Sequence, residues 1–205
     1  MTLTNSYITL AQFKDWATVE DTVNDNMIDV AINAACRAID EYTHRRFYSD
    51  GAATARVYQA TNPHRLRVDD FSTVTGLTVI TDEANSGTYG TTWTITTDFV
   101  VKPSGGNVDS RTFPFYEIVA TGSRTFPTYG PRDRVQVTAN WGWASVPSEV
   151  VEAALIEAHR LIRRKDSPEG IAGGFELGAI RLSKYMDPDA QRLLAPFVRA
   201  NALVL

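Results

Sequence analysis

Residues 140–150 read NWGWASVPSEV and place two tryptophans on either side of one glycine, directly before a proline. In the preceding residues 134–141, apolar and polar side chains alternate, as in a strand with one buried face, and Trp141 falls on the apolar face. From Pro147 onward the apolar spacing becomes that of a helix. This stretch therefore predicts the exit from a β region into a helix.

Two interpretations of the tryptophan pair remain open. Trp141, Trp143 and Pro147 can form a packed β-to-helix corner, because each buried indole removes a large apolar area from water. Alternatively, the rings can be exposed and stack on bases or sugars. The second interpretation requires polar groups around accessible rings.

Working outward, residues 1–50 carry the spacing of two bundle helices. Thr9 is a candidate N-cap for a short helix in which Leu10, Phe13 and Trp16 or Ala17 share one face. A longer helix should follow, with Thr22 and Asp25 as a variant capping box. Its apolar stripe consists of Ile28, Ala31, Ala35, Ile39 and Tyr42.

Residues 51–144 change to a composition rich in Thr, Val, Tyr, Phe and Gly, which is typical of short strands joined by turns. The candidate strands are 55–60, 65–69, 76–81, 92–96, 98–102, 115–122 and 134–141. A third bundle helix is expected within 145–166, and residues 167–205 combine a glycine-rich linker with a last helix that starts at Asp187. The predicted fold class is α+β: a small helical bundle, an antiparallel β region inserted between its second and third helices, and an extended C-terminal arm ending in a helix.

Composition limits the function. The chain has 205 residues, 43% apolar content and a formal net charge of −4, so it can bury a substantial core but lacks the positive charge of a nonspecific nucleic-acid binder. No run of about 18 apolar residues suggests a membrane span, and the N-terminus does not resemble a secretory signal. We expect a soluble intracellular product with no membrane partner.

Catalytic and metal-binding motifs are not found. The histidines His44, His64 and His159 fall in three different regions, and Cys36, the one cysteine, lies in an alanine-rich helical run that favours burial. The sequence contains no P-loop, nucleophile elbow or dinucleotide fingerprint. We therefore expect no enzyme activity, no metal and no cofactor.

Two basic clusters lie at the C-terminal ends of predicted helices: His44-Arg45-Arg46 and Arg163-Arg164-Lys165. Cations at a helix C-terminus compensate the helix dipole and improve solubility. Arginine forks also suit carboxylates on a partner, so Arg45, Arg46, Arg163, Arg164 and Lys165 are candidate subunit contacts.

The arrangement resembles the head-to-tail adaptor proteins, also called connector or head-completion proteins, of long-tailed double-stranded DNA phages. The residues that carry the resemblance are Ala38, Ile39, Asp40, Tyr42, Arg45, Arg46 and Phe47, together with the Trp-Gly-Trp-x-x-x-Pro junction and the following RRKDSPEG. The resemblance covers nearly the whole chain, and the β insertion is longer than in the smallest members.

The resemblance implies a virion protein of the neck, assembled in the host bacterial cytoplasm and without catalytic residues. Such proteins form a ring, typically of twelve copies, beneath the portal, bind a tail-side neck or tail-terminator protein, and let genomic DNA pass through the lumen without specific binding. The C-terminal segment would dock on the portal protein, with Leu193, Leu194, Phe197 and Val198 as anchors flanked by Arg192 and Arg199. Deletion of residues 170–205 would then leave a folded body that no longer attaches.

A function of another class is a binding module. In that interpretation the β region recognises carbohydrate or nucleic acid through exposed aromatic side chains. The candidate stacking residues are Tyr89, Trp93, Trp141 and Trp143.

Overall fold

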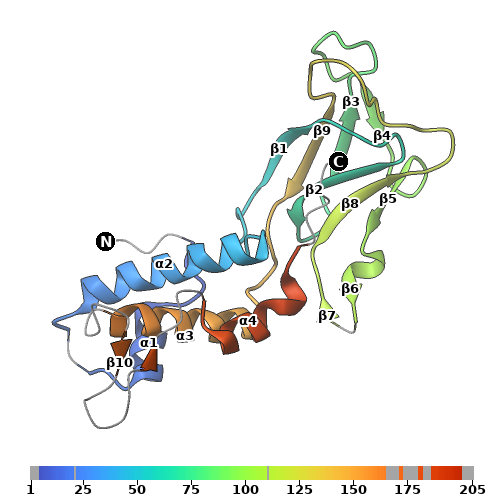
Figure 1. Cartoon of the computed structure of the whole chain (residues 1–205). Helices are drawn as coiled ribbons and strands as arrows, with labels where there is room; N and C mark the ends of the chain where they lie inside the picture. The colour runs from blue at the N-terminus through green and yellow to red at the C-terminus, as the bar shows by residue number, and fades with distance from the viewer. Residues whose placement is uncertain are drawn as a thin grey trace. The chain divides into compact units, whose positions relative to one another are not determined.

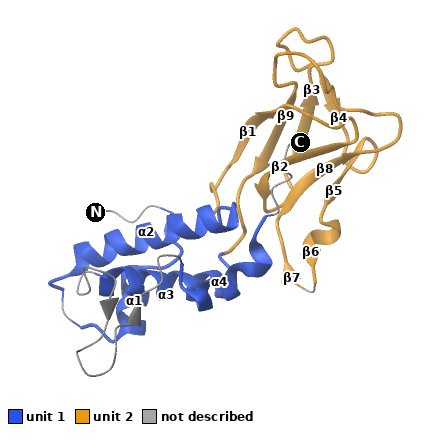
Figure 2. Ribbon diagram, viewed as in Figure 1, with its two compact units in different colours: residues 1–47, 146–205 blue, residues 48–145 orange. Residues whose placement is uncertain are grey.

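The structure is a computed structural model, and it describes residues 5–20, 22–109, 111–164, 171–172, 180–181 and 186–199. The chain forms two compact units (Figures 1 and 2). Unit 1 combines residues 1–47 with 146–205, and unit 2 is the continuous stretch 48–145. The α-helices lie in unit 1 and the larger sheets in unit 2, so the predicted mixed α+β class with antiparallel sheets is confirmed.

Unit 1 begins with α1 (Leu10–Ala17) and α2 (Asp25–Thr43). The predicted cap of α1 is confirmed: the Thr9 hydroxyl accepts from the Gln12 amide, and the Gln12 side chain accepts from the Thr9 amide. The predicted capping box of α2 is wrong, because the N-cap is Asn24 and makes no side-chain cap bond. Asp25 instead forms an ion pair with Lys14 at 2.8 Å.

The core of the helical unit lies between α2 and α3 (Ser148–Arg164), with α1 and α4 (Pro188–Leu194) packed beside them. The apolar stripe predicted for α2 is buried except for Tyr42, which is half-buried. On α3 the buried residues include Val150, Ala153, Ala154 and Ala158. Small side chains on both helices let their backbones approach closely.

The C-terminal part of unit 1 contains α4 (Pro188–Leu194) and the single turn η2 (Ala195–Phe197). Asp187 caps α4 as predicted, with its carboxylate accepting from the Asp189 amide. Leu194 is fully buried and Phe197 is 2% exposed, both within unit 1. Leu194 and Phe197, two of the expected portal anchors, are therefore already buried within their own unit, where α3 and the segment after α2 cover them.

Unit 2 contains two antiparallel sheets. The first has the strand order β1-β9-β3-β4, from β1 (Ala53–Tyr58), β9 (Val135–Asn140), β3 (Thr78–Thr81) and β4 (Thr91–Trp93). The second has the order β2-β8-β5, from β2 (Arg65–Phe71), β8 (Phe115–Ala120) and β5 (Phe99–Lys102). All seven predicted strands are confirmed.

The core of unit 2 draws on both sheets. The predicted alternation of β9 is confirmed, since Val135, Val137 and Ala139 are fully buried while the residues between them are partly exposed. Arg134, expected on the wet face, is instead 2% exposed. Its guanidinium donates to the carbonyl oxygens of Asp82, Glu83 and Tyr129. These hydrogen bonds take the place of those that the guanidinium would make to water.

Two further hairpins have strands of only two residues. In unit 2, η1 (Ser104–Gly106) leads into β6 (Asn107–Val108), which pairs with β7 (Arg111–Thr112), and this hairpin was not predicted. In unit 1, β10 (Ile171–Ala172) pairs with β11 (Ile180–Arg181). The pattern of residues 179–185, AIRLSKY, predicts a short strand that includes β11, whereas β10 was not predicted. Two-residue strands give too little alternation to be recognised in a sequence. Among the described residues, no helix is long and apolar enough to cross a membrane.

Candidate functional site

The junction tryptophans are internal parts of unit 2. Trp141 is 1% exposed, and its indole N–H donates to the Thr54 carbonyl oxygen at 2.8 Å. The Arg56 guanidinium lies 4.6 Å from the centre of the Trp141 ring, and Arg56 also pairs with Asp50 and Asp69. The ring therefore has a polar partner for its N–H and a cation over its face.

Trp143 is equally enclosed. Its indole N–H donates to Asp70 at 3.2 Å, and its ring lies 5.3 Å from that of Phe113. Gly142 between the two tryptophans has φ +96°, and a Cβ there would lie 1.9 Å from the Tyr48 carbonyl oxygen. Only glycine fits this approach, so the Trp-Gly-Trp spacing has a steric cause.

These contacts lie within unit 2, whereas Pro147 lies in unit 1 immediately before α3, where its carbonyl oxygen accepts from Val150 and Val151. Three of the four candidate stacking residues of the binding-module interpretation, Trp93, Trp141 and Trp143, are buried. Trp93 is 4% exposed and stacks on Phe126 at 4.6 Å, and Tyr89 is partly exposed.

The motif at the end of α2 holds unit 1 together. Arg45 is 9% exposed, and its Nε donates to the Phe197 carbonyl oxygen at 2.8 Å. The Phe47 ring meets those of Phe197 and Tyr7 edge-on, at 5.8 and 5.6 Å. Residues near both ends of the chain thus converge on the segment that follows α2. Arg45 has an internal role and offers little surface to a neighbouring subunit.

Asp40 of the same motif binds the N-terminal segment. The Tyr7 hydroxyl donates to the Asp40 carboxylate and accepts from the Phe47 amide at 3.1 Å. Arg37 pairs with Asp40 at 3.1 Å and donates to the Asn5 carbonyl oxygen. Burial raises the pKa of Asp40 above its usual range, although Tyr7 and Arg37 oppose that shift. Burial and the Asp40 contact raise the pKa of Tyr7.

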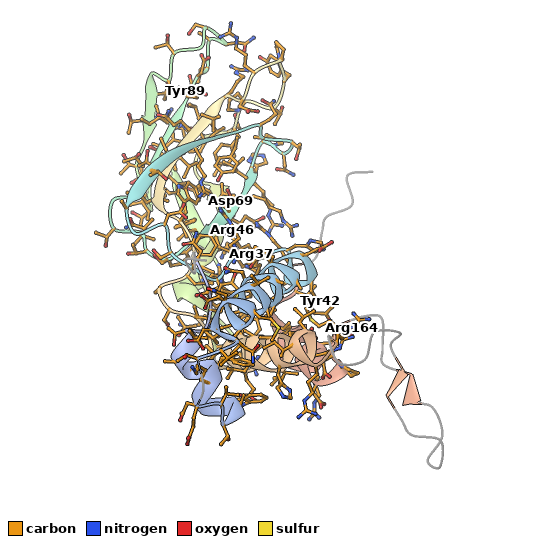
Figure 3. The ribbon with its side chains drawn as sticks, turned by 90° about the vertical axis from the view of Figure 1, so that its left-hand side faces the viewer. Arg37, Tyr42, Arg46, Asp69, Tyr89 and Arg164 are labelled. Atoms are coloured by element: carbon orange, nitrogen blue, oxygen red, sulfur yellow. The ribbon has the colours of Figure 1, made fainter. Side chains whose placement is uncertain are left out.

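The remaining basic candidates are more accessible. Arg46, labelled with Arg37 and Arg164 in Figure 3, is exposed in the segment after α2. Arg163 is exposed and Arg164 partly exposed in the last turn of α3. Lys165 lies outside the described residues.

The predicted portal anchors separate into two classes. Leu194 and Phe197 are internal, whereas Val198 is 39% exposed, Arg192 is exposed and Leu193 is partly exposed. The Arg199 amide donates to the Thr43 carbonyl oxygen at 2.8 Å and ties the end of the described segment to α2.

One surface residue was missed by sequence reasoning. Trp16 was placed on the buried face of α1, but it is 41% exposed and Phe13 alone in that helix is fully enclosed. Its ring meets that of His159 on α3 at 5.5 Å. Burial, aided by Arg163, lowers the pKa of His159. The sequence left open whether Trp16 or Ala17 completes the buried face of this helix, and that ambiguity was the available sign that Trp16 could be exposed.

Other features carry less chemistry. Cys36 is buried and free, and burial raises the pKa of its thiol. Within the described ranges, no group of three His, Cys, Asp or Glu side chains could hold a metal ion. A polar hollow of about 520 Å³ in unit 2 includes Glu83, Arg124 and Arg134, and Arg124 is paired with Asp98 at 3.0 Å.

Neither a family model nor a curated protein matches the sequence. Solved structures do share the fold over all of the chain. A chain from the neck of an empty GTA particle, determined with C6 symmetry, has a TM-score of 0.59 at 17% identity, with 96% of that chain covered. A chain from the neck of a native GTA particle, with C12 symmetry, has a TM-score of 0.56 at 15% identity and the same coverage. A chain from the virion of a native gene transfer agent (GTA) particle has a TM-score of 0.55 at 16% identity, again with 96% covered.

Proposed function

We propose that this protein is a structural component of the neck of a phage-like particle. The observation that carries the proposal is the fold shared over 100% of the chain with chains of GTA necks. The residue pattern that resembles the head-to-tail adaptors supports it independently, because the Asp40, Arg45 and Phe47 motif and the Trp-Gly-Trp junction each have a defined place in the fold.

In the finer form of the proposal, copies of the chain form a ring beneath the portal, which joins the head to the tail and continues the DNA channel. The C12 symmetry of one related neck supports twelve copies. The net charge of −4 supports a lumen through which DNA passes without binding. The tail side of the ring would bind the next neck or tail-terminator protein, and assembly would take place in the host cytoplasm.

The portal contact is proposed for Arg192 and Val198, which are exposed, and for residues 200–205, which lie outside the described residues. Leu194 and Phe197 are excluded from this contact because unit 1 already buries them. Deletion of residues 170–205 is therefore a poor test of attachment, since it would also remove part of the core of unit 1.

The test is to mix the full chain with the portal protein of the same particle and to measure mass by light scattering. We expect a complex that contains a ring of the chain, and we expect deletion of residues 200–205, or Val198→Asp, to weaken attachment while the fold of unit 1 is retained. As a matched control, Val74→Asp in unit 2, at a similarly exposed valine, should attach normally. A wild-type chain that stays monomeric with the portal would contradict the proposal.

A further inference from the structure

Unit 1 exposes a surface on α1 and α3 that is rich in the residue types of protein interfaces. We name it the α1–α3 patch: Trp16, His159 and Arg163. The Trp16 ring packs on His159, and Arg163 Nε donates to His159 Nε2 at 3.2 Å. The few residues that carry most of the binding energy of protein interfaces are enriched in tryptophan and arginine.

The charge of the patch is not neutralised within the part of the chain that is described. No carboxylate there pairs with Arg163, and the lowered pKa of His159 leaves that ring neutral near pH 7. The Nη groups of Arg163 are consequently available to a carboxylate from another molecule. The patch therefore suits a partner with an acidic group next to small apolar side chains.

Unit 1 carries a surface with an acidic group and small apolar side chains on α2. We name it the α2 outer face: Asn26, Val30, Ala34, Arg37 and Glu41. These exposed residues recur at spacings of three and four, opposite the buried stripe of α2. Val30 is 52% exposed, and Arg37 is already paired with Asp40. Among the described residues, Glu41 has no ion-pair partner, which leaves one acidic group beside an apolar centre.

We infer that, in the ring of the proposed function, the α1–α3 patch of each copy packs on the α2 outer face of the next copy. Trp16 would lie against Val30 and Ala34, and the Arg163 guanidinium would pair with Glu41. The inference rests on the proposed function, because it assigns the contact between neighbouring copies.

The dimensions of the two surfaces agree. Ala34 and Glu41 are seven residues apart, or roughly 10 Å along the helix. His159 and Arg163 are one helical turn apart on α3, roughly 6 Å, and the centroid of the Trp16 ring lies 5.5 Å from that of His159. Each surface therefore holds its apolar part and its charged group within about two helical turns of each other.

The topology of unit 1 also suits a ring. Figures 1 and 3 show α1 and α2 on different sides of this unit. A contact between two different surfaces leaves one unused surface at each end of an open chain of copies, and the chain becomes a ring when the rotation between neighbouring copies closes. A contact of either surface with itself would stop at a dimer.

The test exchanges the charges of the proposed pair in the full chain. Arg163→Glu alone and Glu41→Arg alone should each weaken ring formation by at least about tenfold in the concentration required, since each places like charges together. The double variant Arg163→Glu/Glu41→Arg should recover rings. Arg132→Glu, at an exposed arginine of unit 2 that belongs to neither surface, is the matched control and should assemble as the wild type does.

Disulfide trapping gives a second measurement. Arg163→Cys/Glu41→Cys should give a ladder of covalent oligomers up to the ring number, whereas each single-cysteine variant should remain monomeric on a denaturing gel, because Cys36 is buried. Both substitutions are at exposed positions, so folding should be retained.

The outcomes separate the two hypotheses. If the wild-type chain forms a ring but the charge variants assemble normally and the double-cysteine variant gives no ladder, the assigned surfaces are wrong and the proposed function stands. Covalent dimers from a single-cysteine variant would also overturn the assignment. A wild-type chain that forms no ring, alone or with the portal, would overturn the proposed function and this inference together.

Discussion

Units 1 and 2 stabilise their cores in opposite ways. Unit 2 is one continuous stretch, and its tryptophans pack between strands that all lie within residues 48–145. Unit 1 depends on both parts of the chain: Tyr7, Phe47 and Phe197 meet at one place although up to 190 positions (197 − 7) separate them. Unit 2 should therefore tolerate changes near the chain ends, whereas unit 1 should not.

The largest effect is expected from deletion of residues 186–205. It removes Leu194 and Phe197 from the core of unit 1, and loss of a large buried side chain at such positions costs about 2–5 kcal/mol each. Unit 1 should unfold while unit 2 keeps its amide protection in hydrogen exchange. Deletion of residues 200–205 is the control and should leave both units protected. Loss of protection in unit 2 after the longer deletion would contradict the separation of the two cores.

Trp141→Ala should act on unit 2 alone. It removes a ring that is 1% exposed, and we expect a loss of about 3–5 kcal/mol in the free energy of unfolding of that unit. Trp16→Ala in unit 1, where the ring is 41% exposed, should change stability by no more than about 0.5–1 kcal/mol. Urea unfolding followed by circular dichroism compares the two variants, and equal losses would show that the assigned burial is wrong.

Gly142→Ala tests the steric cause of the Trp-Gly-Trp spacing. The left-handed backbone and the overlap with the Tyr48 carbonyl oxygen should together cost about 3 kcal/mol. Gly51 has φ +77° and open space at its Cβ position, so Gly51→Ala should lose only about 1 kcal/mol, the conformational cost alone. Thermal unfolding measures the loss of stability in each variant. The steric explanation requires a larger loss for Gly142→Ala than for Gly51→Ala.

The smallest effect is expected from Tyr7→Phe in unit 1. The change leaves the Phe47 amide without its acceptor and should cost about 1–3 kcal/mol. It also removes a donor that opposes the raised pKa of Asp40, so that pKa should rise further. A carboxyl whose folded-state pKa is raised destabilises the fold when ionised, and this contribution disappears as the pH falls below the ordinary aspartate range.

The loss from Tyr7→Phe should accordingly be larger at pH 7 than near pH 4. Denaturant unfolding at the two pH values measures it, with Tyr129→Phe, at an exposed tyrosine in unit 2, as the control. A loss that is independent of pH would show that the Tyr7 hydroxyl does not stabilise the ionised form of Asp40.

Local patterns were sufficient for the longer helices and strands. Strict alternation placed β9, and the Thr9 and Asp187 caps placed the starts of α1 and α4. Prediction failed where a side chain finds a partner far away in the chain. Arg134 is buried by three carbonyl oxygens from other loops, and Trp16 is exposed because Phe13 occupies the core position of its helix.

The sequence by itself determined the order of helices and strands, the aromatic junction and the resemblance to phage adaptors, because periodicity, capping and turn residues act over a few positions. Only the tertiary structure decided which apolar surface is used internally. It buries Leu194 and Phe197 within their own unit and leaves Trp16 and the α2 outer face accessible. The physical reason is that burial depends on which distant segments of the chain meet. In a helix with two possible apolar faces, the local sequence does not indicate which face its neighbours will cover.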